Sequence, residues 1–303
     1  MDLQVVSLYP HDLAMRVAYA FNRPLIVPHI EQLPDSEVIL SFPPSCLWEN
    51  SLVLLIQPTG VPIHDTLVKI ALLAEHIKQA GASKIIGVIP YLGYARQLNN
   101  DVLGLKSPVQ AIIQLLESCP VDEYVLVEPH DKNIKLLFKK PVIDVDVTEI
   151  VVQHIKLHMP LDSNCVVAPD KGAFARAHNI AQRIGCPFLV YHKKRINPEE
   201  VRILDVQGAY TGKNAIIIDD IFNTGTTAHQ VSSDLFARGI HAITGYFIHP
   251  VFSNSAYKMI EKSFFQQIFV SNSLPLQHTA PTKVKVFDIS DALVKAVTPL
   301  LRK

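Results

Sequence analysis

Acidic, hydroxyl-bearing and glycine residues follow a short apolar run in "AIIIDDIFNTGTTAHQ", residues 215–230. The apolar run predicts a buried strand, with Asp219 and Asp220 emerging at its carboxyl end. Two adjacent carboxylates repel each other unless a cation or hydroxyl groups lie over them. Residues 223–227 are interpreted as a turn leading into a helix, where free N–H groups and the helix dipole favour a phosphate.

A phosphate held by the turn and a diol or magnesium ion held by the acids together describe a ribose 5-phosphate unit. An Asp turn followed by Thr helix caps is the purely structural alternative. The residues predicted to bind ribose 5-phosphate are Asp219, Asp220, Asn223, Thr224, Gly225, Thr226 and Thr227.

The elements that would position these residues are short β-branched runs, several of them separated by amphipathic stretches. Residues 65–82, for example, have apolar side chains at helical spacing and a glycine at the end. Strands that are apolar on both faces and alternate with helices indicate parallel sheets covered on both sides, so the predicted class is α/β. The predicted strand runs lie at 51–58, 83–92, 123–130, 164–172, 186–194, 214–220, 241–250 and 265–273.

Two parts of the chain have a similar pattern. Residues 54–66 and 216–230 both run from a strand through a Thr-Gly loop into a helix, which suggests two related domains. We predict an N-terminal domain of residues 1–144 and a C-terminal domain of residues 145–303, with a last helix able to pack back on the first domain. Because ligands of open parallel sheets bind beyond the carboxyl ends of strands, the loops there are the candidate sites.

Composition excludes several classes of protein. The chain has 303 residues, 49% of them hydrophobic, which is enough for two domains with sizeable cores. Lys plus Arg and Asp plus Glu number 28 each, without the basic excess typical of nucleic-acid binders. Four scattered cysteines without a C-x-x-C pair favour free thiols over zinc or disulfides. No stretch is interpreted as a secretion signal or membrane span, so we expect a cytoplasmic protein.

The motif at 215–230 resembles the phosphoribosyl pyrophosphate loop that phosphoribosyltransferases share with ribose-phosphate pyrophosphokinases. Two further stretches resemble segments of the pyrophosphokinases. "VIPYLGYARQ" (88–97) resembles their nucleotide-binding segment, which implies that Arg96 and Gln97 bind ATP. "LPDSEV" (33–38) resembles a segment that reaches the nucleotide of a neighbouring subunit, which implies the same role for Asp35 and Glu37.

Three more stretches extend the resemblance over nearly the whole chain. "VEPHDKNIKLLF" (127–138) resembles the segment whose histidine helps to hold the metal, which implies that role for His130. "APDKGAFARAHNIA" (168–181) resembles the segment whose aspartate faces metal and sugar phosphate, here Asp170, although a helix cap is the structural alternative. "YHKKRINPEEV" (191–201) resembles a loop that closes over the transferred diphosphate, which implies that Lys193 and Arg195 are catalytic.

The sequence departs from the family at several positions. Leu98 stands where the family carries Asp, and Leu33 where a Phe stacks on the base. Ser36 replaces a glycine, and Thr226 stands where glycine normally lets backbone approach the phosphate. "EPHD", "APDKGA" and "KKRINPEE" lean towards the archaeal-type branch.

The resemblance implies two phosphoribosyltransferase-type domains, an N-terminal one on the ATP side and a C-terminal one on the ribose 5-phosphate side. It implies an enzyme that moves the β,γ-diphosphate of ATP to the C1 hydroxyl of ribose 5-phosphate, with Mg²⁺ as cofactor. It also implies a homo-oligomer, at least a dimer, with the active site near a subunit interface, and no nucleic-acid or membrane partner. The alternatives are a non-catalytic regulatory homologue and a phosphoribosyltransferase.

Overall fold

The computed structural model describes residues 2–44, 46–98, 107–159, 164–195, 201–208, 212–253, 255–276 and 279–302, but not the side chains of 193–195 and 201–203. The chain divides into two compact units. Unit 1 comprises Met1–Asp146 and Asp288–Lys303, and unit 2 comprises Val147–Phe287. The sequence predicted a division after residue 144.

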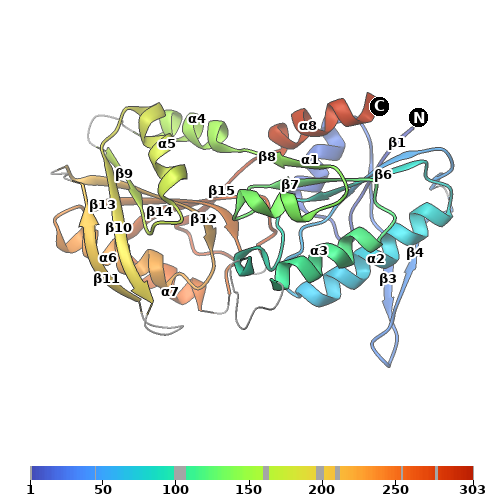
Figure 1. Ribbon diagram of the computed structural model, residues 1–303, viewed down its shortest axis with the longest axis horizontal. Coiled ribbons are helices and arrows are strands. Elements are labelled where there is room, and N and C mark those ends of the chain that lie inside the picture. The colour runs from blue at the N-terminus through green and yellow to red at the C-terminus, as the bar shows by residue number, and fades with distance from the viewer. Residues whose placement is uncertain are drawn as a thin grey trace. The chain divides into compact units, whose positions relative to one another are not determined.

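Unit 1 is built on a parallel sheet of six strands in the order β2-β1-β5-β6-β7-β8. Helices α1 and α8 cover one face and α2 and α3 the other (Figure 1). Strand β5 is buried along its whole length because it lies inside the sheet with helices on both faces. The strands are β1 (Leu3–Val6), β2 (Leu25–Ile26), β5 (Leu52–Ile56), β6 (Lys84–Ile89), β7 (Glu123–Val127) and β8 (Val142–Val145). The helices are α1 (Asp12–Ala20), α2 (Ile63–Gln79), α3 (Pro108–Ser118) and α8 (Ser290–Val297), with 3₁₀ turns η1 (Ala95–Gln97), η2 (Lys132–Leu137) and η3 (Thr298–Arg302).

An antiparallel hairpin of β3 (His29–Gln32) and β4 (Val38–Ser41) extends from unit 1 (Figure 1). Ile30 and Leu40 pack against the apolar core of the unit, whereas Ile39 is about half exposed. At the tip, Ser36 has a left-handed backbone conformation with φ of 74°. A side chain strains the backbone in this conformation, which suits the glycine that the resemblance implies at this position.

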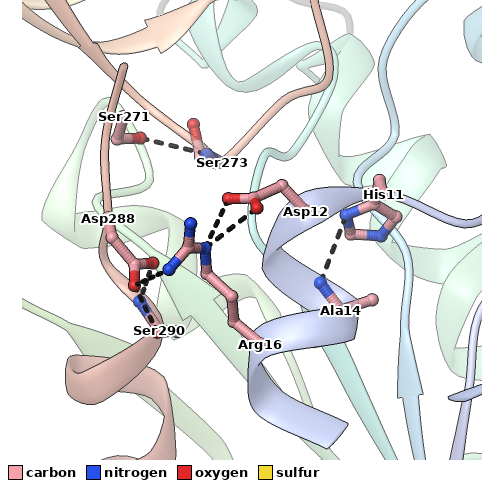
Figure 2. Close-up of polar contacts among 8 residues, drawn as sticks. All are labelled: His11, Asp12, Ala14, Arg16, Ser271, Ser273, Asp288 and Ser290. Carbon is pink, nitrogen blue, oxygen red and sulfur yellow. Dashed lines mark hydrogen bonds and ion pairs between the residues drawn. The ribbon is translucent and has the colours of Figure 1, made fainter. Parts of the chain in front are cut away.

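The C-terminal segment is tied to α1 by Arg16, as Figure 2 shows. Its Nε donates to the carboxylate of Asp12 at 2.8 and 2.9 Å, and its Nη1 donates to Asp288 at 3.3 Å. Asp288 also accepts hydrogen bonds from the N–H and hydroxyl of Ser290, at the start of α8. These contacts join residues from opposite ends of the chain within unit 1.

Unit 2 is built on a sheet of seven strands in the order β11-β10-β9-β12-β13-β14-β15, parallel except for the β10–β11 pair. Helices α4 and α5 lie on one face and α6 and α7 on the other (Figure 1). The strands are β9 (Asn164–Ala168), β10 (Phe188–Arg195), β11 (Val201–Gln207), β12 (Asn214–Phe222), β13 (Ala242–Pro250), β14 (Phe265–Ser271) and β15 (Val284–Phe287). The helices are α4 (Thr148–His158), α5 (Phe174–Ile184), α6 (Thr226–Ala237) and α7 (Ala256–Lys262).

The predicted α/β class with mainly parallel sheets is confirmed, and each predicted strand run contains a strand. Asp219 and Asp220 lie near the carboxyl end of β12, as predicted, but the strand extends beyond the predicted run of 214–220. It continues to Phe222 by pairing Asp219, Ile221 and Phe222 with the long strand β13.

We predict that Ser36→Gly slightly stabilises the protein. The left-handed conformation costs a non-glycine residue about 1–2 kcal/mol, and the greater freedom of glycine in the unfolded chain offsets about 0.5–1 kcal/mol of that gain. The net gain in the free energy of unfolding is therefore about 0.5 kcal/mol, measured by urea unfolding. Ser41→Gly in β4 is the control and should destabilise; a loss of stability in both variants would contradict the argument.

Candidate functional site

Three carboxylates gather at the carboxyl ends of two neighbouring strands of unit 2. Strand β12 carries Asp219 and Asp220, and Asp170 follows β9, which pairs with β12 in parallel. Asp220 is buried, and its N–H donates to Asp219 Oδ1 at 2.9 Å. Burial, followed by the charges of Asp220 and Asp170, raises the pKa of Asp219 well above its ordinary value. The site therefore disfavours a further negative charge and favours a cation or hydroxyl donors.

Asp170 also organises the turn in front of α5. Its Oδ1 accepts the N–H of Ala173 at 3.1 Å. Ala173 itself is the N-cap of α5, which has no side-chain cap hydrogen bond, so the alternative of Asp170 as the helix cap is wrong. A Cβ on Gly172 would lie 3.1 Å from the same oxygen, so glycine leaves that oxygen room. This contact does not exclude a ligand, because each carboxylate oxygen accepts more than one hydrogen bond.

The turn between β12 and α6 begins with Asn223 and has its left-handed residue at Gly225, with φ of 80°. A Cβ there would lie 2.8 Å from the ring of Phe222 and 3.0 Å from Cβ of Met259, so only glycine fits. The hydroxyls of Thr224 and Thr226 lie 3.1 Å apart and bond to each other. Thr226 and Thr227 form the first residues of α6, and the N–H of Thr226 donates to the hydroxyl of Thr224 at 3.4 Å.

The loop after β13 contacts this turn and stabilises it. The N–H groups of Phe252 and Ser253 donate to the carbonyls of Phe222 and Asn223 at 3.1 and 3.2 Å. The rings of Phe222 and Phe252 pack edge to face, with centroids 5.2 Å apart. The position of the turn is therefore set by a loop that sequence motifs did not single out.

Strand β10 ends with the predicted catalytic residues Lys193 and Arg195, whose side chains lie outside the described structure. The register with β11 shifts between His192 and Lys193. The strand is anchored to α6 by Tyr191, whose buried hydroxyl donates to Asp234 Oδ2 at 2.7 Å. Arg238 Nε donates to the same oxygen at 2.6 Å.

The other predicted residues lie in unit 1. Arg96, exposed, and Gln97 form the turn η1 beyond β6, and Arg96 makes no ion pair with a described residue. Asp35 and Glu37 are exposed at the hairpin tip, where the N–H of Glu37 donates to Asp35 Oδ1 at 3.2 Å. His130 is exposed beyond β7.

The structure shows the surroundings of two residues that differ from the pattern of the family that the sequence resembles. Leu98 packs against the apolar core of unit 1, a contact that the carboxylate of the family could not make. Leu33 lies at the hairpin tip, where its N–H donates to the carbonyl of Glu37 at 2.8 Å.

Within the described ranges, no group of three or more His, Cys, Asp or Glu residues is arranged to hold a metal. Magnesium commonly keeps several waters and is bound by one or two carboxylates together with substrate phosphates, so this finding is compatible with a magnesium site. None of the described helices is long and apolar enough to cross a bilayer.

Comparison with known proteins gives matches along most of the chain. Residues 4–119 match the model of the N-terminal domain of ribose phosphate pyrophosphokinase, and residues 192–303 match the phosphoribosyl synthetase-associated domain. A ribose-phosphate pyrophosphokinase of Methanothermobacter thermautotrophicus is 30% identical over 86% of this chain and 90% of the relative. One of Helicobacter hepaticus is 29% identical over 88% and 85%. The leaning towards the archaeal branch stays a prediction.

The structure resembles that of phosphoribosylpyrophosphate synthetase from Mycobacterium smegmatis, with a TM-score of 0.88. The two chains share 22% identity, and the similarity covers 100% of this chain and 99% of that one. At this identity the likeness establishes the fold.

We predict that Asp219→Asn stabilises the ligand-free protein at pH 7. Because the folded-state pKa of Asp219 is raised, the stability linked to its protonated form is present at low pH and lost as the pH rises from 3.8 through the folded-state pKa. The neutral amide of Asn removes that loss, so the free energy of unfolding at pH 7 rises by an amount on the order of 1 kcal/mol. Thermal unfolding from pH 3.5 to 8 measures it. If the difference in stability between the variant and the wild type does not grow with pH, the charge of Asp219 is not its cause.

We predict that Tyr191→Phe lowers the free energy of unfolding by about 1 kcal/mol, because it removes a buried hydrogen bond to Asp234. Urea unfolding at pH 7 measures this loss. Tyr19→Phe is the matched control, since Tyr19 is 86% exposed. Equal stability of the Tyr191→Phe variant and the wild type would show that this anchor contributes nothing.

Proposed function

The chain belongs to the ribose-phosphate pyrophosphokinase family, and from this premise we propose that it is an enzyme that transfers the β,γ-diphosphate of ATP to ribose 5-phosphate. The products are AMP and 5-phosphoribose 1-diphosphate. The observation that supports the proposal most is the meeting of three carboxylates, Asp170, Asp219 and Asp220, with a glycine turn at the start of a helix. We assign unit 2 to ribose 5-phosphate and unit 1 to ATP.

Ribose 5-phosphate binds to the turn and the acids together. The backbone N–H groups and hydroxyls of Thr224, Thr226 and Thr227 hold the 5-phosphate, aided by the dipole of α6. Asn223 and Gly225 shape the turn. Asp219 and Asp220 accept hydrogen bonds from the ribose hydroxyls, whose donors offset the crowding of charge at Asp219.

ATP is held by Arg96 and Gln97 of one subunit, with Asp35 and Glu37 supplied by another. The oxygen on C1 of the sugar attacks the β-phosphorus, and the bond to AMP breaks in line with the attack. Such transfers depend on positioning and on neutralising charge, which Lys193 and Arg195 provide most strongly in the transition state.

Mg²⁺ fits the site because hard carboxylate oxygens are its preferred protein ligands, and the raised pKa of Asp219 marks a lack of positive charge there. Asp170 would contribute to its coordination shell. For His130, in unit 1, the proposal of a metal ligand rests on the resemblance of its segment alone. When bound, Mg²⁺ neutralises charge on the phosphates.

The proposed working form is a cytoplasmic homo-oligomer, since Asp35 and Glu37 serve a neighbouring subunit. The fold alone would also suit a phosphoribosyltransferase, but the stretches around Arg96 and Lys193 resemble only the pyrophosphokinases. A catalytically silent regulatory homologue would bind nucleotide without releasing AMP.

Release of AMP from purified protein with ATP, Mg²⁺ and ribose 5-phosphate tests the proposal. We expect AMP and 5-phosphoribose 1-diphosphate in equal amounts, and no AMP when the sugar is omitted. Binding of ATP without sugar-dependent AMP would refute the enzyme and favour the regulatory homologue.

We predict that Lys193→Ala slows turnover by about 100-fold or more while the affinity for ribose 5-phosphate stays within about twofold, because the lysine acts mainly in the transition state. Steady-state kinetics and calorimetric titration measure the two quantities. Lys194→Ala, in the same strand, is the matched control and should leave turnover near that of the wild type. Parallel losses of binding and turnover in Lys193→Ala would contradict this role.

A further inference from the structure

Two loops of unit 1 emerge side by side from the neighbouring parallel strands β5 and β6. Thr59, in the first loop, is fully buried, and its N–H and hydroxyl both donate to the carbonyl of Tyr91 at 2.9 Å. The same hydroxyl accepts the N–H of Gly93 at 2.6 Å. One threonine thus fastens the loop after β5 to the start of "YLGYARQ".

The loops approach so closely that one position requires glycine. A Cβ on Gly93 would lie 2.9 Å from the carbonyl oxygen of Thr59 and 3.2 Å from Cγ2 of Ile63. Any side chain would therefore push the loops apart. Since Ile63 begins α2, the second loop rests on a rigid helix.

The residue after Gly93 is held in a strained conformation. Tyr94 has φ of 68°, which is rare for a bulky residue and costs about 1–3 kcal/mol unless surrounding contacts maintain it. It is the cap residue of η1, and its carbonyl accepts the N–H of Gln97 at 2.8 Å. The conformation of Tyr94 therefore sets the direction of the turn η1, which carries Arg96.

His64 contacts the hydroxyl of this strained tyrosine. Its Nε2 lies 2.7 Å from Tyr94 Oη, the ring centroids are 6.0 Å apart, and His64 is the second residue of α2. This bond holds the far end of the Tyr94 side chain while Gly93 and Thr59 hold the backbone beside it. The turn with Arg96 is thus fixed at two points.

We propose that His64 is a positioning residue for the nucleotide: its bond to Tyr94 maintains the left-handed turn and so orients Arg96 towards ATP. The inference rests on the proposed function, in which Arg96 binds ATP. Without the bond, Tyr94 relaxes towards ordinary backbone angles, and Arg96 must be ordered again when ATP binds. The cost falls on ATP affinity and leaves the ribose 5-phosphate site in unit 2 unaffected.

Calorimetric titration with ATP and, separately, ribose 5-phosphate tests the role of His64. His64→Ala should weaken ATP binding about 3- to 10-fold, the range expected for one net hydrogen bond, and leave ribose 5-phosphate affinity unchanged. Tyr94→Phe should give the same loss, and the double variant no further loss, because both changes break one contact. His64→Gln, whose amide can both donate and accept, should recover part of the affinity. His241→Ala, an exposed histidine of unit 2, serves as the control.

The outcomes separate this inference from the proposed function. If the wild type binds no ATP, the proposed function fails. If the wild type binds ATP and His64→Ala binds it equally well, the positioning role fails and the proposed function stands. Losses that add in the double variant would also overturn the role, because His64 and Tyr94 would then act independently. Unchanged ribose 5-phosphate binding shows that unit 2 of each variant is folded.

Discussion

The site of unit 2 depends on a crowding of negative charge that the fold maintains at a cost to stability. Asp219 lies beside Asp220 and within the field of Asp170, in surroundings that raise its pKa. A chain selected for stability alone would not keep three carboxylates together at the carboxyl ends of two neighbouring strands. The apolar cluster beneath, which includes Ile217, offsets the cost, and a ligand with hydroxyls or a cation would relieve it.

The same constraint explains the local backbone around the acids. Strand β12 continues past Asp219 because β13 is long enough to pair with it, so the acids are held by a rigid sheet and not by a loop. The chain must then turn sharply into α6, which Gly225 allows. The loop at Phe252 supports the turn through backbone hydrogen bonds. Acids and turn are therefore preorganised relative to each other.

Sequence predicts those features that depend on local pattern. The runs around β5, β9 and β12 are apolar on both faces, and this alone indicated buried parallel strands. The hairpin β3–β4 was missed, since β3 is largely exposed and polar and the apolar run of β4 covers only residues 38–40. The motifs named the candidate residues, but not the supports of the site. The bond between His64 and Tyr94 joins the start of α2 to the loop after β6, and no pattern within either segment reveals their distance.

The central claim is that the carboxylates and the glycine turn bind one ligand together, a sugar through its hydroxyls and its phosphate through the turn. Calorimetric titration of the protein with ribose 5-phosphate, ribose and inorganic phosphate, each with Mg²⁺, tests this most directly. The account predicts that ribose 5-phosphate binds at least about 100-fold more tightly than either fragment, because one ligand engages both halves. Inorganic phosphate binding as tightly as ribose 5-phosphate would contradict it, since the acids would then contribute nothing to recognition of the sugar.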